Sequence, residues 1–375
     1  MSGLQTPRGA WVEVDLGAVE RNVRALRRLT GPKTRFMAVV KADAYGHGLE
    51  RVAVAATRGG AHRFGVATVA EALRLRESGV TAPIHLLSEP PVESAPVIVE
   101  HEIVPTVFSG TFAKALASAA VAGGVTARFH LKVETGMNRI GVPAEEAAEA
   151  ADALRGVPGI SMEGVYTHFA TADVPGDWDF DRQVERFEGA LAAMRDRGID
   201  PGIVHAANSP ATILHPATHY AMVRCGIAIY GLHPAPATEG RVDLEPAMSV
   251  KALVTRVRRL ALGEGVSYGL TYRAAGPTTI ATLPLGYADG VHRAASNAMR
   301  VLIAGKPCRQ VGRVCMDQLM VEVPRGLDVS VGDEAVIVGG GGSTRIPLEE
   351  LASASGTINY EIACSFGLRM ERLYR

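Results

Sequence analysis

Eight short apolar runs alternate with helix-like stretches between residues 35 and 231, and this alternation constrains the fold more than any other feature. Several runs are continuous in Val, Ile and Phe, as strands buried on both faces are. Strands that alternate with helices predict a parallel sheet, either closed as a barrel or open and doubly wound. The runs are Arg35–Ala42, Arg63–Thr68, Ile84–Ser88, Ile103–Phe108, Arg128–Glu134, Met162–Phe169, Ile203–Ala207 and Val223–Tyr230.

The stretches between these runs favour the closed barrel. Gly or Pro follows several of them, as expected at helix ends. No Gly-x-Gly-x-x-Gly motif opens the first helix, which disfavours an open dinucleotide-binding sheet. We therefore expect an α/β fold with an N-terminal (β/α)8 TIM-like barrel. Its helical stretches include Ala67–Ser78, Thr111–Ala122, Pro143–Leu154 and Phe180–Arg195.

The sequence changes character after about residue 245. Short runs with alternating or β-branched residues, separated by Gly and Pro turns, predict a mostly antiparallel β domain. Helical stretches return only near residues 347–366. The early run Trp11–Val14 precedes the barrel, and we expect it to add a strand to this second domain. The predicted domains are a cofactor-binding barrel over residues 15–240 and a β domain over residues 1–14 and 241–375.

Composition narrows the class of protein. The 375 residues carry 39 Lys and Arg against 39 Asp and Glu, so the net charge at pH 7 is zero, whereas nucleic-acid binders normally carry a basic excess. No run of about 18 apolar residues could span a bilayer, and residues 1–8 contain no apolar signal-peptide core. The four cysteines form no Cys-x-x-Cys pair, which favours reduced thiols. We expect a cytoplasmic protein without nucleic-acid or membrane partners.

Catalytic groups of a barrel lie at the carboxyl ends of its strands. The eight predicted ends offer one lysine, two arginines, one histidine and a pocket of small residues suited to an anion. A glycosidase would need two opposed carboxylates, and a metal site would need a His, Asp or Glu cluster at ligand spacing. Neither pattern is found. The residues at the strand ends are Lys41, Glu134, Arg139, His168, Asn208, Ser209, Arg224 and Gly226.

Lys41 and the pair Ser209 and Gly226 fit the two ends of pyridoxal phosphate. An amine at the mouth of an apolar strand is partly desolvated, which lowers its pKa and suits it to imine formation. Barrels often bind phosphate after their seventh and eighth strands. Taken singly, however, each residue also has a purely structural explanation: Lys41 as an exposed surface lysine, Ser209 as a helix N-cap and Gly226 as a packing glycine.

The segment Ala38–Gly48, AVVKADAYGHG, resembles the cofactor-lysine signature of bacterial alanine racemases. A second segment, Lys132–Gly141, is similar to the barrel-lysine and arginine motif of that family. Further matches follow in the family's order, so that the resemblance spans residues 11 to 366. They are Thr167–Ala170, Asn208–Ser209, Arg224–Gly226, Ser267–Gly269, Gly286–Gly290, Cys315–Gln318 and Ile358–Glu361.

The resemblance implies a racemase that interconverts L-alanine and D-alanine through a pyridoxal-phosphate aldimine and supplies D-alanine for peptidoglycan. Lys41 would hold the cofactor aldehyde and serve as one base, and the partner subunit's Tyr268 would be the other base in a homodimer. Arg224 would donate a hydrogen bond to the pyridine nitrogen without giving it a proton, where most pyridoxal enzymes place a carboxylate. His168 would support Arg224 and Tyr268.

The resemblance also assigns the remaining contacts. Arg139 would meet the ring phenolate and the substrate carboxylate, which the Met316 backbone would also touch. Lys132 resembles a lysine that is often carbamylated in this family and would then orient Arg139. The other cofactor ligands would be Tyr45, Asn208, Ser209, Gly226, Ile227 and Tyr360. The substrate entrance would be lined by Asp173, Tyr287, Arg293, Arg313 and Ile358.

Other functions stay open at this point. A non-catalytic carrier of pyridoxal phosphate could use the same barrel, although the β domain and Tyr268 disfavour it. A racemase for serine or another small amino acid is disfavoured by Tyr287 and Tyr360, which would crowd the pocket. The residues also do not show whether the chain is a racemase paralogue that sequesters a cyclic amino-acid antibiotic.

Overall fold

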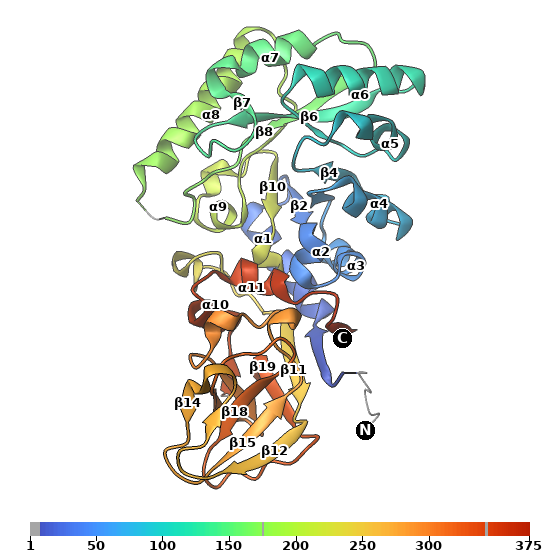
Figure 1. Ribbon diagram of the computed structural model, residues 1–375. Coiled ribbons are helices and arrows are strands. Elements are labelled where there is room, and N and C mark those ends of the chain that lie inside the picture. The colour runs from blue at the N-terminus through green and yellow to red at the C-terminus, as the bar shows by residue number, and fades with distance from the viewer. Residues whose placement is uncertain (1–7, 175, 342–343) are drawn as a thin grey trace. The chain divides into compact units, whose positions relative to one another are not determined.

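A computed structural model describes residues 8–174, 176–341 and 344–375, which form two compact units (Figure 1). The barrel unit comprises Gly17–Ala44 and Leu49–Glu245. The β unit comprises the described residues of Met1–Leu16 and Pro246–Arg375, together with Tyr45–Gly48. Residues 1–7 of the expected second domain lie outside the described residues.

Eight parallel strands form the expected barrel. They are β2 (Arg35–Val39), β3 (Arg63–Val66), β4 (Ile84–Leu86), β5 (Thr106–Val107), β6 (Ala127–Glu134), β8 (Ile160–Tyr166), β9 (Ile203–His205) and β10 (Met222–Cys225). They pair in the order β4-β3-β2-β10-β9-β8-β6-β5, and the two-residue β7 (Val142–Pro143) pairs with β6. A bridge between His85 and Val104 joins the two edges and closes the sheet. The predicted barrel is confirmed.

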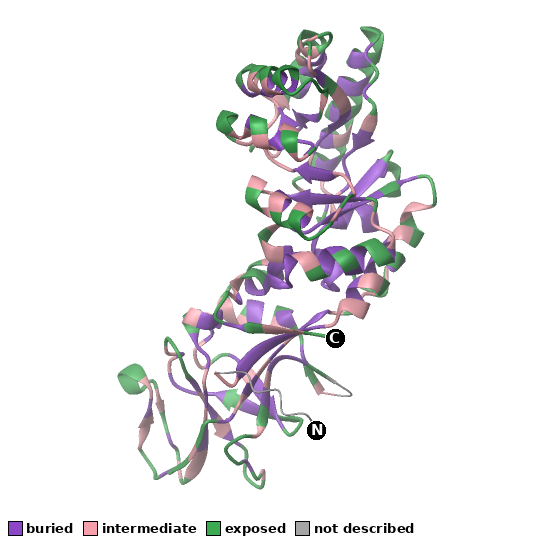
Figure 2. Cartoon of the chain, turned by 90° about the vertical axis from the view of Figure 1, so that its right-hand side faces the viewer, coloured by how far each residue is buried: buried purple, intermediate pink, exposed green. Residues whose placement is uncertain are grey.

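Helices connect the strands and bury one side against them, as the purple residues in Figure 2 show. In the helix that begins with Val69, the Thr68 hydroxyl accepts the Glu71 N–H while the Glu71 carboxylate accepts the Thr68 N–H, which fixes where the helix begins. None of the helices in the described ranges is both long and apolar enough to cross a membrane. The helices are α1 (Leu16–Thr30), α3 (Leu49–Gly59), α4 (Val69–Glu77), α5 (Ala95–Glu100), α6 (Gly110–Ala122), α7 (Ala147–Leu154), α8 (Trp178–Asp196) and α9 (Ser209–Leu214).

The eighth predicted strand is shorter than the apolar run Val223–Tyr230. It ends at Cys225, and Ile227–Tyr230 forms the 3-10 helix η4. The Gly226 N–H donates to the Ser209 hydroxyl at 3.0 Å instead of continuing the strand. Because Ile227, Ile229 and Tyr230 are all buried, apolar character alone could not separate strand from helix at this point.

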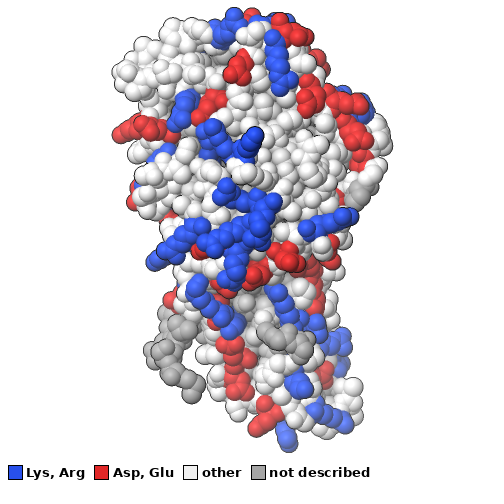
Figure 3. Space-filling model, turned by 180° about the vertical axis from the view of Figure 1, so that it is seen from behind, with Lys and Arg blue, Asp and Glu red and all other residues white. Residues whose placement is uncertain are grey.

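The first barrel helix, α1, packs its apolar side inward through Val19, Val23 and Leu26 and presents arginines outward. Figure 3 shows Lys and Arg side chains gathered on the face where α1 lies. Two of these arginines have carboxylate partners, since Arg21 pairs with Glu245 and Arg24 pairs with Glu20. The basic patch is therefore partly neutralised within the barrel unit.

The β unit is mostly antiparallel, as the sequence predicts. Its main sheet has the order β12-β15-β18-β17-β16-β19-β11-β1-β21, with β20 beside β19. β1 (Ala10–Val14) pairs antiparallel with β11, so the early run does add a strand. The other strands are β11 (Met248–Leu253), β12 (Arg256–Leu260), β13 (Gly265–Val266), β14 (Tyr272–Arg273), β15 (Thr278–Leu283), β16 (Arg300–Ile303), β17 (Lys306–Gln310), β18 (Leu319–Val323), β19 (Glu334–Gly341), β20 (Thr344–Ile346) and β21 (Glu371–Tyr374), and the helices are α10 (Leu348–Ser355) and α11 (Asn359–Ser365).

Candidate functional site

Lys41 begins α2 (Lys41–Gly46), a short helical turn that follows β2 and winds in the left-handed sense. The four residues Ala42 to Tyr45 have φ between 52° and 55°, and Gly46 follows at 77°. A left-handed conformation costs a non-glycine residue about 1–2 kcal/mol, so four in succession store strain that surrounding contacts must offset. The strain lies directly beside the predicted cofactor lysine.

Two carboxylates hold this turn. Glu71 accepts the Ala42 N–H at 2.6 Å, besides capping α4. Asp43 accepts the Leu49 N–H at 3.2 Å and pairs with Arg74 at 3.0 Å. The conformation of the turn after Lys41 is therefore fixed by Glu71 and Arg74 of α4 and by the backbone of Leu49, the first residue of α3.

Arg224 lies in the barrel interior and is almost wholly buried, with 3% of its surface exposed. Its Nη1 donates to His205 Nδ1 at 3.0 Å, and its Nη2 shares its two N–H groups among His168 Nδ1, the Thr167 carbonyl and the Ala206 carbonyl. No hydrogen bond from its Nε–H is found in the described part of the chain. Burial lowers the pKa of Arg224 to about 10, so it remains a cation at neutral pH.

His168 is held neutral beside this cation. Burial and the nearby positive charges, Arg224 first among them, keep the pKa of His168 well below its usual 6.5. A guanidinium can only donate, so His168 Nδ1 accepts and the ring proton resides on Nε2. The other cations that lower this pKa are Arg139, Lys132 and Lys41. The structure thus brings the predicted barrel cations within electrostatic reach of one another.

Lys132 projects from β6 and is also buried, with its Nζ donating to the Val133 carbonyl at 2.6 Å. Burial lowers the pKa of Lys132 from 10.5 to about 8, although nearby Glu134 opposes the shift. Glu134 itself accepts the Gly136 N–H at 2.5 Å and the Arg139 N–H at 3.4 Å. Arg139 therefore lies on a loop held to the end of β6.

The expected phosphate ligands of the barrel unit also meet. Asn208 caps α9 by accepting the Ala211 N–H at 3.1 Å, and Ser209 is the first residue of that helix. The Ser209 hydroxyl lies 3.0 Å from the Gly226 nitrogen, and Ile227 follows. The predicted turn from strand to helix after the seventh barrel strand is thus present.

In the β unit, the rings of Tyr45 and Tyr360 lie 6.2 Å apart. Gly46 is required beside them because a Cβ there would collide with the Ala363 carbonyl, besides being strained at φ 77°. Burial raises the pKa of Tyr45 above its usual range, so it is a neutral hydroxyl and a hydrogen-bond donor. Two of the predicted phosphate ligands are therefore neighbours.

Tyr268 is 69% exposed and lines a surface pocket of the β unit together with Met316. The Met316 and Cys315 carbonyls accept the Ala288 and Tyr287 N–H groups, each at 3.0 Å. Buried Asp289 anchors this loop by pairing with Arg8. The predicted second base and substrate-contacting backbone thus share one pocket. Of the predicted entrance residues, Asp173, Tyr287, Arg293 and Ile358 are exposed and Arg313 is half-buried.

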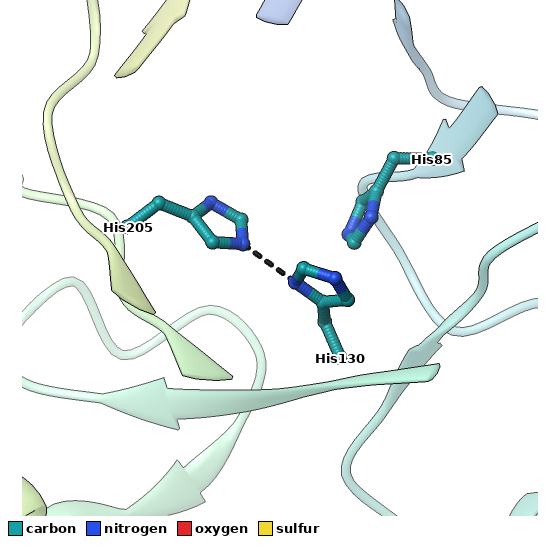
Figure 4. Close-up of side chains that lie close together, drawn as sticks. All are labelled: His85, His130 and His205. Carbon is teal, nitrogen blue, oxygen red and sulfur yellow. Dashed lines mark hydrogen bonds between the residues drawn. The ribbon is translucent and has the colours of Figure 1, made fainter. Parts of the chain in front are cut away.

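Sequence reasoning missed a group inside the barrel. His85, His130 and His205 meet there, fully buried, with one nitrogen of each within 4.8 Å of the others (Figure 4). The spacing along the sequence did not indicate this cluster, because the three side chains come from strands distant in sequence. Glu71 was also missed, although the capping-box spacing of Thr68 and Glu71 could have indicated it.

Two family models account for almost the whole chain. "Alanine racemase, N-terminal domain" matches residues 14–234, and "Alanine racemase, C-terminal domain" matches residues 247–374. The chain belongs to the alanine racemase family. Racemisation of alanine is the reaction for which this family is named.

Individual relatives agree with this assignment. The alanine racemase of Symbiobacterium thermophilum is 46% identical over 367 residues, covering 98% of this chain and 97% of that protein. The crystal structure of alanine racemase from D-cycloserine-producing Streptomyces lavendulae has a TM-score of 0.94 at 39% identity, covering 99% and 98% of the two chains. The Bacillus anthracis alanine racemase with bound L-Ala-P has a TM-score of 0.92 at 38% identity, covering 98% and 95%.

The residues present fit pyridoxal phosphate, the cofactor expected from this family. An amine ends a barrel strand, and the hydroxyl of Ser209 meets the Gly226 backbone at the ends of two others. Both Nη groups of Arg224 have protein acceptors, and its Nε–H has none among the described residues, so the Nε–H can donate to a ring nitrogen.

The left-handed turn predicts opposite effects for two alanine-to-glycine substitutions. Exposed Ala42 is left-handed, so Ala42→Gly should raise the free energy of unfolding by up to about 1 kcal/mol. Exposed Ala193 lies in the right-handed helix α8, so Ala193→Gly should lower it by about 1 kcal/mol. Thermal or denaturant unfolding measures both, and a loss of stability in Ala42→Gly equal to that in Ala193→Gly would contradict the account of strain.

The lowered pKa of Lys132 predicts that its reaction with CO2 increases with pH. Only the neutral amine attacks CO2, giving a carbamate and releasing a proton, so carbamate should accumulate as the pH rises through about 8. 13C NMR with labelled bicarbonate measures this signal. It should vanish in Lys132→Met and persist in the control Lys251→Arg, which changes a lysine paired with Glu13 and Glu334. A signal unaffected by Lys132→Met would refute the assignment.

Proposed function

We propose that this chain racemises alanine with pyridoxal 5'-phosphate bound at the carboxyl ends of the barrel strands. The observation that carries the proposal is buried Arg224, whose Nη groups are committed to four protein acceptors. When bound, the cofactor supplies an electron sink that acidifies the Cα–H of the amino acid attached to it. Arg224 limits that sink, because a guanidinium donates a hydrogen bond to the ring nitrogen without protonating it.

Lys41 and Tyr268 are the two groups that we propose move the proton. Lys41 Nζ would hold the cofactor and, once released, take or return the Cα proton on one face of the substrate. The phenolic oxygen of the partner subunit's Tyr268 would act on the other face, since one base cannot easily serve both. His168 supports this role, because its Nε2–H can donate to the phenolate and so favour ionisation of the tyrosine.

We propose that the remaining predicted residues bind the two anionic ends of the complex. Arg139 and the Met316 backbone would hold the substrate carboxylate, and a carbamate on Lys132 would orient Arg139. The phosphate would be held by Ser209, Gly226 and Ile227, with Asn208 fixing the start of α9, and by Tyr45 and Tyr360. The substrate would enter past Asp173, Tyr287, Arg293, Arg313 and Ile358.

We propose a homodimer with shared sites and a division of the chain into a barrel over residues 15–240 and a β domain over residues 1–14 and 241–375. The matches of two family models to residues 14–234 and 247–374 support this division. The exposure of Tyr268 supports the shared site. A phenol that is 69% exposed in a pocket of its own unit is accessible to another chain.

The first test of this function is Lys41→Ala. This variant should lose the visible absorption of bound cofactor and all D-alanine formation from L-alanine, because no amine remains at the end of β2. The control Lys33→Ala changes an exposed lysine and should retain both properties. D-alanine formation by Lys41→Ala would refute the proposal, and cofactor binding without racemisation in the unsubstituted chain would favour a carrier.

The second test mixes two inactive chains. If each site takes Lys41 from one chain and Tyr268 from the other, a dimer of Lys41→Ala with Tyr268→Ala has one intact site. A random mixture should then recover roughly a quarter of the unsubstituted activity. D-alanine formation by the co-expressed chains measures this recovery, and two Lys41→Ala chains serve as the inactive control. A mixture as inactive as its parents would show that the sites are not shared.

A further inference from the structure

The histidine cluster in the barrel interior has a defined direction of hydrogen bonding. His205 Nε2 lies 2.7 Å from His130 Nδ1, as the dashed line in Figure 4 shows. Beyond this pair, His205 Nδ1 meets Arg224 Nη1 at 3.0 Å, and His130 Nε2 meets Glu163 Oε2 at 2.9 Å. The four side chains form one continuous series from a guanidinium to a carboxylate.

The guanidinium decides where every proton of this series lies. Arginine can only donate, so His205 Nδ1 carries no proton and its Nε2 does. That Nε2–H donates to His130 Nδ1, which leaves the His130 proton on Nε2, directed at Glu163. In the reversed arrangement, His205 Nδ1–H would face an N–H of Arg224.

The same reasoning argues against a metal ion among the three histidines. A metal at the cluster would need His205 Nε2 as a ligand, but that nitrogen carries the proton as long as Nδ1 accepts from Arg224. The charges of Arg224 and Arg63 also lower the pKa of His205 and would disfavour a further cation. His130 and His205 therefore act through hydrogen bonds, and His85 contributes its ring contacts.

Both imidazoles are neutral, and the carboxylate at the end is charged. Burial lowers the pKa of His130 and lowers that of His205 still further below 6.5. Burial alone would raise the pKa of Glu163, but hydrogen bonds from Arg63 and His130 outweigh it and hold that pKa well below its usual range. Arg63 binds both Glu163 oxygens, at 2.6 and 2.8 Å.

Neighbouring rings fix the planes of the two histidines. Tyr166 stacks on His205 with 4.7 Å between ring centroids and 5° between planes, and its hydroxyl is held by Thr106 at 2.7 Å. His85 packs edge-on against His130 at 4.5 Å. Neither histidine can turn over without losing these contacts, so the series has one geometry as well as one arrangement of protons.

We infer that Glu163 is a positioning residue for Arg224, acting through His130 and His205. The inference deepens the proposed function, because it rests on Arg224 being the group that meets the cofactor ring. Glu163 accepts the His130 Nε2–H and so stabilises the same tautomers that Arg224 requires, which keeps His205 Nδ1 an acceptor that holds Arg224 Nη1. A charged side chain in the middle of β8 thereby orients a guanidinium on β10 that it does not touch.

The tautomers are tested directly in the unsubstituted protein. 15N NMR of histidine-labelled chain, with and without pyridoxal phosphate, should show His130 and His205 neutral and protonated on Nε2 from about pH 6 to pH 8. Single substitutions to Gln assign the two signals. A proton on Nδ1 of either ring, or a doubly protonated ring in this range, would overturn the inference whether or not the chain racemises alanine.

Glu163→Gln tests the effect on Arg224. An amide in this position must direct its NH2 either at the arginines or at His130 Nε2, so one contact becomes donor against donor. We expect kcat for alanine to fall roughly 10-fold with KM within about 2-fold, together with a changed 15N pattern at His205. The control Glu245→Gln alters another bidentate arginine pair, with Arg21, and should change neither readout.

The outcomes separate the two proposals. If Glu163→Gln keeps the unsubstituted kcat and the unsubstituted His205 signal, Glu163 does not position Arg224, although the chain remains a racemase. If the unsubstituted protein makes no D-alanine but shows both Nε2 tautomers and a Glu163→Gln change at His205, the proposed function fails and the hydrogen-bonded series remains.

Discussion

The buried positive charge of Arg224 shapes the interior of the barrel. In the described residues, Arg224 is held by imidazoles and carbonyls rather than by a carboxylate, so its charge is not cancelled nearby. Its neighbours must then be neutral or anionic, and His168 and His205 both have lowered pKa values. Lys132, buried close by, is an amine with a pKa of about 8 instead of an ordinary lysine. Burial is the first cause of all three pKa shifts, and the charge of Arg224 adds to each of them.

The barrel and much of the candidate site could be predicted because they depend on local patterns. Apolar runs with helices between them located the strands, and their ends located Lys41, His168 and Arg224. The end of the eighth strand could not be predicted, because Ile227–Tyr230 is as apolar as a strand while forming a 3-10 helix. Burial on all sides removes the periodicity on which such a prediction relies.

The histidine cluster could not be predicted from the sequence for a different reason. His85, His130 and His205 lie on β4, β6 and β9, and no spacing along the chain relates them. In the sequence Glu163 likewise resembles any other strand residue, and only the folded sheet places it beside Arg63. The left-handed turn after Lys41 was also missed, because Ala, Asp and Tyr normally avoid that conformation and only tertiary contacts impose it.

The closure of the barrel has a consequence for the local opening of its sheet. β6 and β8 pair along most of their length, whereas β4 and the approach to β5 are joined by one bridge, with the backbone hydrogen bonds Leu86 N to Val104 O and Val104 N to Ile84 O. Local opening begins where few bonds must break, so this seam is one of the weak lines of the cylinder, as is the single residue pair between β9 and β10. His85 lies on the seam, so a transient parting there would expose the buried imidazoles to water and to deuterium exchange.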